Sequence, residues 1–209
     1  MNGLHAFVGI APTDSGCSVA VLFPRFTTSS YRVRLLNLFR FDAREEHREL
    51  FEYAYRELRD QRTPLGGAEA VHITADVSGG IRGQLLLEGL QRLYREPFPR
   101  VPRYSAVVLV QTGEVISRPE GFGFAKLPRA LAASALVRVA SGGRLDIEQK
   151  GKLAREFLAQ LEASRQKRAR DEEDPFDLVD AVSLAAYALA RKADPVVRRL
   201  EEERRRKPW

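Results

Sequence analysis

The stretch VHITADVSGG, residues 71–80, joins a short apolar strand pattern to a glycine turn and carries one charge, Asp76, where the two meet. The β-branched and apolar residues before Asp76 are typical of a strand inside a sheet. In α/β proteins the carboxyl ends of such strands form the edge at which ligands bind. We therefore expect Asp76 either at a functional edge or, as the alternative, capping the turn through a side-chain oxygen.

The segments on both sides of this stretch predict further strands and helices. Partly alternating apolar residues before residue 43 predict three consecutive antiparallel strands, and apolar spacings of three and four over residues 43–62 predict an amphipathic helix. Glycine-rich residues 112–126 are expected to form a loop or hairpin. The remaining patterns predict one strand, residues 104–111, and four helices, residues 81–94, 127–143, 147–165 and 174–193.

This order of elements predicts one α/β domain over residues 1–193, followed by a charged tail over residues 194–209. The domain is expected to hold a mixed β-sheet, in which three antiparallel strands are followed by parallel additions, flanked by helices. No internal repeat or domain boundary is visible in the sequence.

The charge composition favours a nucleic-acid partner. The 209 residues carry a net charge of +6, with 28 arginines and six lysines, and the planar arginine side chain suits phosphates. A solvated helical surface carrying salt bridges is the alternative explanation. The single cysteine, Cys17, excludes an intramolecular disulfide, and no apolar run reaches the ~20 residues of a membrane span. We expect a soluble protein of the cytoplasm with no membrane partner.

A second acidic group lies in DPFDLVDA, residues 174–181. Asp174 and the following proline suit the start of a helix, so helix capping explains part of this group. Asp177 and Asp180 are three residues apart and share one helical face, which is expected to point inward. Because an unpaired buried charge is costly, a metal shared with Asp76 would satisfy these carboxylates. Convergent carboxylates suit a pair of Mg²⁺ or Mn²⁺ ions that hydrolyse a phosphodiester.

Other catalytic centres find little support in the sequence. His5, His47 and His72 lack the spacing of metal ligands, and neither a CxxC pair nor a phosphate-binding GxxxxGK[ST] loop occurs. The nucleophile motif GxSxG is also absent. We therefore interpret the histidines as structural residues.

Taken together, four stretches resemble the C-terminal nuclease domain of the large terminase subunit of tailed bacteriophages, which has an RNase H-like fold and cuts DNA during packaging. The stretches are VGIAPTDSGCSVAVL, HITADVSGGIRGQLLLEGL, FAKLPRALAASALVRVASGGRLDI and DPFDLVDAVSLAAYALA. Holliday-junction resolvases share this order of elements, but their second acid is typically a glutamate within the strand. The resemblance implies a metal-dependent DNA endonuclease with two Mg²⁺ or Mn²⁺ ions, double-stranded DNA as substrate, and portal or motor components as partners.

The family places metal-binding acids at the end of the first strand, after the fourth strand and at the start of the last helix. By resemblance, Asp76 matches the second acid, Asp177 the third and Asp180 a common further aspartate. Ala11 stands where the family has the first aspartate, so we expect cleavage to be impaired. Three explanations for Ala11 stay open. The alanine is an engineered substitution, or Asp14 supplies the carboxylate instead of residue 11, or the protein is a natural nuclease relative that does not cut DNA.

Three functional alternatives follow from the resemblance. The first is an impaired terminase-like endonuclease, with Arg82 and Lys126 contacting phosphate. The second is an inactive DNA-binding or scaffolding module of the same fold, and the third is a resolvase-like nuclease. A complete large terminase has an ATPase domain before the nuclease, so we expect an excised domain or a stand-alone relative. If the source is a phage, the location is the bacterial host cytoplasm.

Overall fold

The computed structural model describes residues 5–13, 16–26, 31–42, 47–78, 81–98, 102–110, 125–148, 150–166 and 176–193. The predicted acid Asp14, the expected helix cap at Asp174 and the charged tail lie outside these residues. No helix in the described ranges is both long enough and apolar enough to cross a membrane.

A seven-stranded mixed sheet forms the centre of the protein, in the order β6-β5-β4-β1-β2-β3-β7. The strands β1, β2 and β3 are antiparallel neighbours, whereas β4, β5 and β6 add in parallel beside β1, and β7 adds in parallel beside β3. This arrangement confirms the predicted sheet. The strands are β1 His5–Pro12, β2 Gly16–Phe26, β3 Tyr31–Asp42, β4 Ala70–Asp76, β5 Arg103–Val110, β6 Ala125–Pro128 and β7 Leu145–Ile147.

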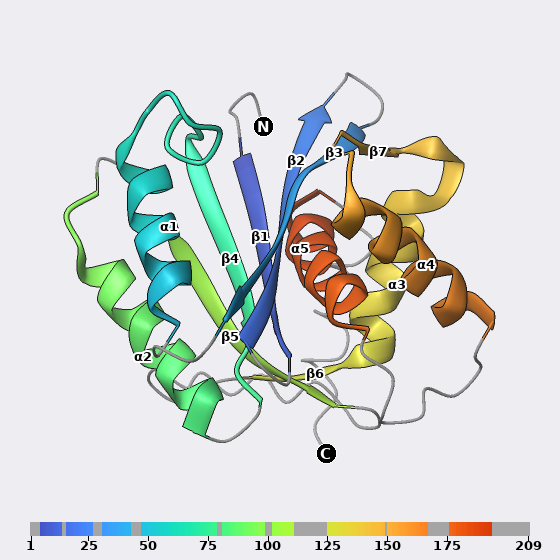
Figure 1. Ribbon diagram of the computed structural model, residues 1–209. Coiled ribbons are helices and arrows are strands. Elements are labelled where there is room, and N and C mark those ends of the chain that lie inside the picture. Colours follow the sequence, from blue (N-terminus) through green and yellow to red (C-terminus); the bar gives the residue numbers. More distant parts are fainter. Residues whose placement is uncertain are drawn as a thin grey trace, which may run out of the picture.

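Helices cover both faces of the sheet, as Figure 1 shows. One face carries α1 and α2, and the other carries α3, α4 and α5. Each face has its own apolar core, because side chains alternate between the two sides along every strand. The helices are α1 Arg48–Arg59, α2 Ile81–Arg95, α3 Arg129–Ala140, α4 Lys152–Gln166 and α5 Asp177–Ala193, with a short 3-10 turn at Ser141–Gly143.

Several boundaries differ from those predicted. The amphipathic helix expected over residues 43–62 is shorter in the structure, Arg48–Arg59. The region expected as a loop and then a helix contains the strand β6, and α3 begins only at Arg129, after Pro128. The helix expected over residues 147–165 begins only at Lys152, and its first expected residue, Ile147, belongs to β7, which pairs with β3. Both missed strands are very short, so they carry no periodic pattern.

Helix α5 lies directly on the central strands. It packs on β1 and β2, and the backbones of α5 and β1 approach each other very closely at Gly9. A Cβ atom on Gly9 would lie 1.9 Å from the main-chain oxygen of Ala181 in α5. The glycine therefore allows the backbone of the helix to rest on the backbone of the strand.

Candidate functional site

The parallel strands β1, β4, β5 and β6 all end at the same edge of the sheet. Their last residues are Pro12, Asp76, Val110 and Pro128. The chain neighbours of Asp76 are Ala75 in β4 and Val77 just after it, and both belong to the core under α1 and α2. Because side chains alternate along a strand, Asp76 faces the opposite layer, which holds α5. Asp177 and Asp180, in the first turn of α5, are buried on the same layer.

Asp76 is almost fully buried and accepts three hydrogen bonds. Its Oδ1 accepts from the amide nitrogens of Ser78 at 3.0 Å and Leu109 at 3.2 Å, and its Oδ2 accepts from the Ser78 hydroxyl at 3.0 Å. Burial raises the pKa of Asp76 above its ordinary value, and the hydrogen bonds oppose that shift. The bonds to Ser78 give Asp76 the turn-capping contacts that the sequence left open as an alternative.

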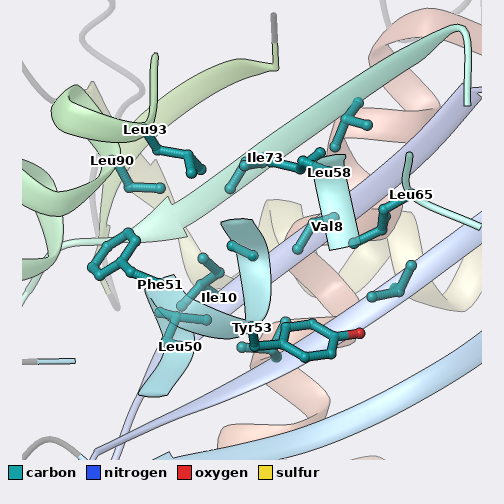
Figure 2. A pocket seen from close by; sticks show the side chains of 14 residues that line it. Val8, Ile10, Leu50, Phe51, Tyr53, Leu58, Leu65, Ile73, Leu90 and Leu93 are labelled. Atoms are coloured by element: carbon teal, nitrogen blue, oxygen red, sulfur yellow. The ribbon is translucent and has the colours of Figure 1, made fainter. Parts of the chain in front are cut away.

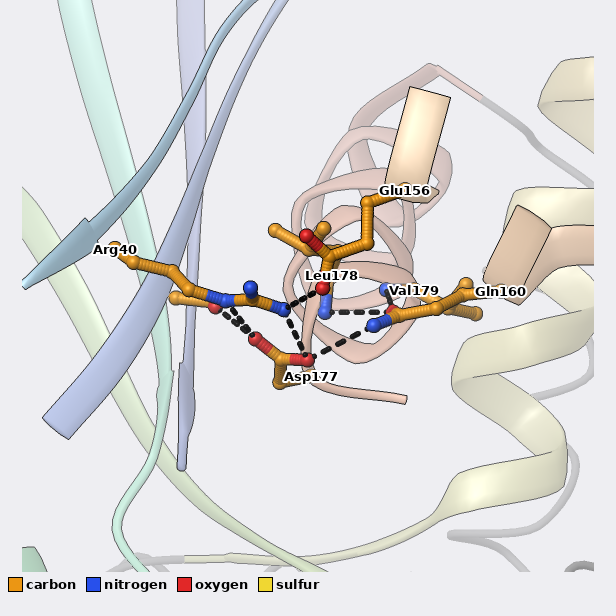
Figure 3. A network of polar contacts seen from close by, with 7 residues as sticks. Arg40, Glu156, Gln160, Asp177, Leu178 and Val179 are labelled. Atoms are coloured by element: carbon orange, nitrogen blue, oxygen red, sulfur yellow. Dashed lines mark hydrogen bonds and ion pairs between the residues drawn. The ribbon is translucent and has the colours of Figure 1, made fainter. Parts of the chain in front are cut away.

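Asp177 lies at the centre of a polar network, drawn in Figure 3. Arg40 of β3 donates from Nε to Oδ2 at 2.8 Å and from a terminal nitrogen to Oδ1 at 2.9 Å. Gln160 of α4 donates to Oδ1 at 3.0 Å, and the Ser18 hydroxyl of β2 donates to Oδ2. Burial alone would raise the pKa of Asp177, but the bonds from Arg40, Ser18 and Gln160 outweigh burial and lower it.

Asp180 lies one helical turn after Asp177 and forms an ion pair with Arg129 at 3.4 Å. Arg129 follows directly after β6, so it reaches the same edge of the sheet, and its charge opposes the upward shift of the Asp76 pKa. The Nε atom of Arg129 is buried without a hydrogen-bond partner. Arg129 therefore connects Asp76 and Asp180 electrostatically.

Ala11 occupies the β1 position between these acids. It is 1% exposed and lies opposite Ser18, whose hydroxyl contacts Asp177. Ala11 also belongs to the apolar core beneath α5. An acidic side chain at this position would consequently point into the same layer as Asp177, next to the strand that ends at Asp76.

The predicted phosphate contacts lie in different places. Arg82 is an exposed residue in the first turn of α2, and its main-chain oxygen lies 3.3 Å from Nε2 of His47. Lys126 is exposed on β6, two residues before that strand ends. The contact of either side chain with DNA stays a prediction.

Sequence reasoning missed Arg40, Ser18, Gln160 and Arg129. Only Arg40 left a signal, because the alternation of β3 places it on the same face as the buried Leu38. The side chain of Arg40 is 37% exposed, but a charged residue on the core-facing side of a strand indicates an acidic partner there. The contacts of the other three depend on how β2, α4 and β6 meet α5, which no local pattern reveals.

Carboxylate oxygens are the type of ligand that a hard divalent ion prefers, but the site offers too few of them. Among the described residues, no three side chains of histidine, cysteine, aspartate or glutamate lie close enough together to hold a metal ion. Ala11 supplies no ligand, and both oxygens of Asp177 are already engaged. The arrangement therefore does not fit a complete two-metal centre.

Comparison with known proteins gives a match at the level of structure. No family model and no curated protein matches the sequence. The nuclease domain of the human cytomegalovirus terminase aligns with a TM-score of 0.58 and 13% identity, over 93% of this chain and 86% of that domain.

Two further structures of the same viral domain give similar values. A Mn-soaked form has a TM-score of 0.56 and 15% identity, over 93% of this chain and 85% of that one. A Mn-soaked form with a bound inhibitor has a TM-score of 0.55 and 16% identity, over 90% and 83%. The predicted RNase H-like fold of a terminase nuclease domain is thus confirmed, and the matching structures are from human cytomegalovirus rather than from a tailed bacteriophage.

Proposed function

We propose that the protein is a DNA-processing domain of the nuclease type, with its functional centre at the edge formed by Asp76, Asp177 and Asp180. The observation that supports this proposal most strongly is the burial of these acids on one layer of the sheet, where Arg129 pairs with Asp180 and acts electrostatically on Asp76. The acids come from β4 and α5, about a hundred residues apart. The fold is shared with a viral terminase nuclease domain.

In this proposal the substrate is double-stranded DNA and the reaction is hydrolysis of a phosphodiester, with Mg²⁺ or Mn²⁺ as the cofactor of an intact centre. Cleavage is impaired in the present sequence, because Ala11 supplies no carboxylate and the remaining acids do not form a metal-binding group among the described residues. DNA packaging, portal or motor partners, and a phage host cytoplasm as the location follow from the resemblance and stay predictions.

Plasmid cleavage in Mn²⁺ tests the proposal, with the protein compared to its Ala11→Asp variant. We expect at most weak nicking by the unchanged chain and faster nicking by Ala11→Asp, because the new carboxylate adds the absent ligand. Asp76→Asn introduced into Ala11→Asp should abolish the gain. If Ala11→Asp cuts no faster while remaining folded, the proposed nuclease centre is wrong.

A non-catalytic DNA-binding module is the second candidate, and the buried Ala11 favours it. Its methyl group fills a place in the apolar core beneath α5, as a residue without a catalytic role would. This candidate predicts DNA binding in EDTA that weakens with salt, together with no cleavage by Ala11→Asp. The two candidates therefore give opposite results in the same plasmid assay.

A further inference from the structure

The carboxylate of Asp177 has no acceptor position left for a metal ion. An ionised carboxylate offers about four lone-pair positions, and Asp177 accepts four hydrogen bonds. Two come from Arg40 in a side-on, two-point contact, one from Ser18 and one from Gln160. A metal ion could bind Asp177 only by displacing at least one of these donors.

The donors also fix the start of α5 in place. Gln160 of α4 accepts from the amide nitrogens of Leu178 and Val179, at 3.1 and 3.3 Å, while its own amide donates to Asp177. Arg40 spans from β3 to α4 by a second ion pair, with Glu156 at 2.6 Å. Figure 3 shows these side chains converging from the sheet and from α4 on the first turn of α5. The network therefore joins three elements to the amino end of α5.

Arg40 supplies Asp177 with the positive charge that a metal ion would otherwise supply. Asp177 is 6% exposed, and a buried carboxylate without a counter-ion is costly. The guanidinium group of Arg40, whose charge Asp177 shares with Glu156, compensates it at hydrogen-bonding distance, in the two-point geometry that favours arginine over lysine. A divalent cation at the same oxygens would have to lie beside this positive charge.

We propose that Arg40 is an internal counter-ion that takes the place of a divalent metal at Asp177 and holds the amino end of α5 on the sheet in metal-free protein. As long as Ala11 is present, Asp177 is then a structural residue rather than a metal ligand, and a metal centre restored by Ala11→Asp would have to displace Arg40 from it. The proposal concerns metal binding and stability without DNA, so it can be tested separately from the proposed DNA function.

Thermal unfolding in EDTA and in millimolar Mn²⁺ tests the proposal on the full chain. We expect the unchanged protein to have the same Tm in both. Arg40→Met should lower Tm in EDTA by about 5 °C, because Asp177 loses its counter-ion, and Mn²⁺ should restore part of this loss. Arg34→Met is the matched control: Arg34 lies on the same strand and pairs with Glu148, away from Asp177. Its Tm should not respond to Mn²⁺.

A second measurement decides the matter if Arg40→Met does not fold. The electron paramagnetic resonance signal of Mn²⁺ reports the ion bound by the unchanged protein and by Asp177→Asn. Equal binding by the two supports the proposal. Mn²⁺ binding by the unchanged protein that is lost in Asp177→Asn overturns it, and so does an Mn²⁺-induced rise in Tm that disappears in the same variant.

Discussion

At the scale of single residues, Gly9 sets the distance between β1 and α5. Gly9→Ala would place a methyl group 1.9 Å from the main-chain oxygen of Ala181 and 2.7 Å from the main-chain nitrogen of Ala185. These backbone atoms of α5 cannot move aside as a flexible side chain can, so α5 and β1 must move apart. We expect the free energy of unfolding to fall by about 3 kcal/mol or more, measured by urea denaturation.

Gly67→Ala is a suitable comparison for Gly9→Ala. Its added methyl group would lie 3.0 Å from the nearest atom, the main-chain oxygen of Gln61, and Gly67 is exposed. The expected loss is under about 1 kcal/mol. Equal losses in the two variants would contradict the importance that we assign to the close approach of β1 and α5.

A pair of stacked histidines gives a prediction on pH. The rings of His5 and His72 lie 5.6 Å apart, centre to centre, with 3.3 Å between two ring nitrogens. Burial, followed by the charges of Lys192, His5 and Arg103, lowers the pKa of His72 from 6.5 to about 4. Between pH 6.5 and about 4, His72 therefore takes up a proton in the unfolded chain but stays neutral in the folded protein.

The sign of the effect follows from this difference in proton uptake. The free energy of unfolding should fall as the pH drops from about 6.5 towards 4, and should be unaffected by His72 above that window. Urea denaturation at a series of pH values measures the slope. His72→Phe should flatten it but not remove it, because burial also lowers the pKa of His5. An unchanged slope in His72→Phe would show that another group titrates.

The location of the three acids could be predicted from the sequence, whereas the residues that form hydrogen bonds and ion pairs with them could not. Asp76 follows a recognisable strand, and Asp177 and Asp180 share a helical face, so their burial on one layer was expected. The pairing of Asp177 with Arg40 joins residues 137 apart in the chain. Such a contact depends on how β3 and α5 pack together in the folded protein, and the local periodicity of the sequence does not predict that packing.

At the scale of elements, α1 packs less tightly on the sheet than α5 does. A cavity of about 30 Å³, lined only by carbon-rich side chains, lies between α1, α2 and strands β1, β2 and β4. Figure 2 shows Val8 and Ile10 of β1 directed at this space, opposite Leu50 and Leu58 of α1. A void of this kind forfeits dispersion contacts along its walls.

Filling the cavity should stabilise the protein. Val8→Ile adds one methyl group beside the void and suits a strand, so the free energy of unfolding should rise by roughly 0.5–1 kcal/mol. Val33→Ile, on the opposite face, adds the same group where Val33 is already fully buried and should lower it. Chemical denaturation of both variants measures the difference. A loss in Val8→Ile would show that the cavity cannot accept a methyl group.

The element order could be predicted because its longer members carry clear periodicity. Strands β1 to β5 and helices α2, α3 and α5 lie close to their expected positions, whereas α1 and α4 begin several residues later than expected. Residues 125–128 and 145–147 were missed, since strands of four and three residues are defined only by their partners β5 and β3. Pairing of that kind belongs to the tertiary structure.

At the scale of the whole molecule, the net charge of +6 predicts salt-dependent binding to double-stranded DNA. Arg82→Ala and Lys126→Ala should each weaken binding and reduce the slope of log affinity against log salt by about 1, if each residue contacts one phosphate. Fluorescence anisotropy at several salt concentrations measures this slope. Arg48→Ala is the control, because Arg48 lies on α1 in an ion pair with Glu52. The same change in slope for Arg48→Ala would argue for a diffuse charge effect.

The packing of α5 on β1 also has a consequence for synthesis on the ribosome. Strand β1 is made more than 160 residues before α5, the helix that covers one face of the central strands. Until residues 177–193 emerge, the apolar side chains of β1, β2 and β3 on that face lack their largest covering element. These apolar side chains therefore stay exposed on the nascent sheet until α5 has been made. We expect a chaperone that binds exposed apolar strands to bind the sheet during this time.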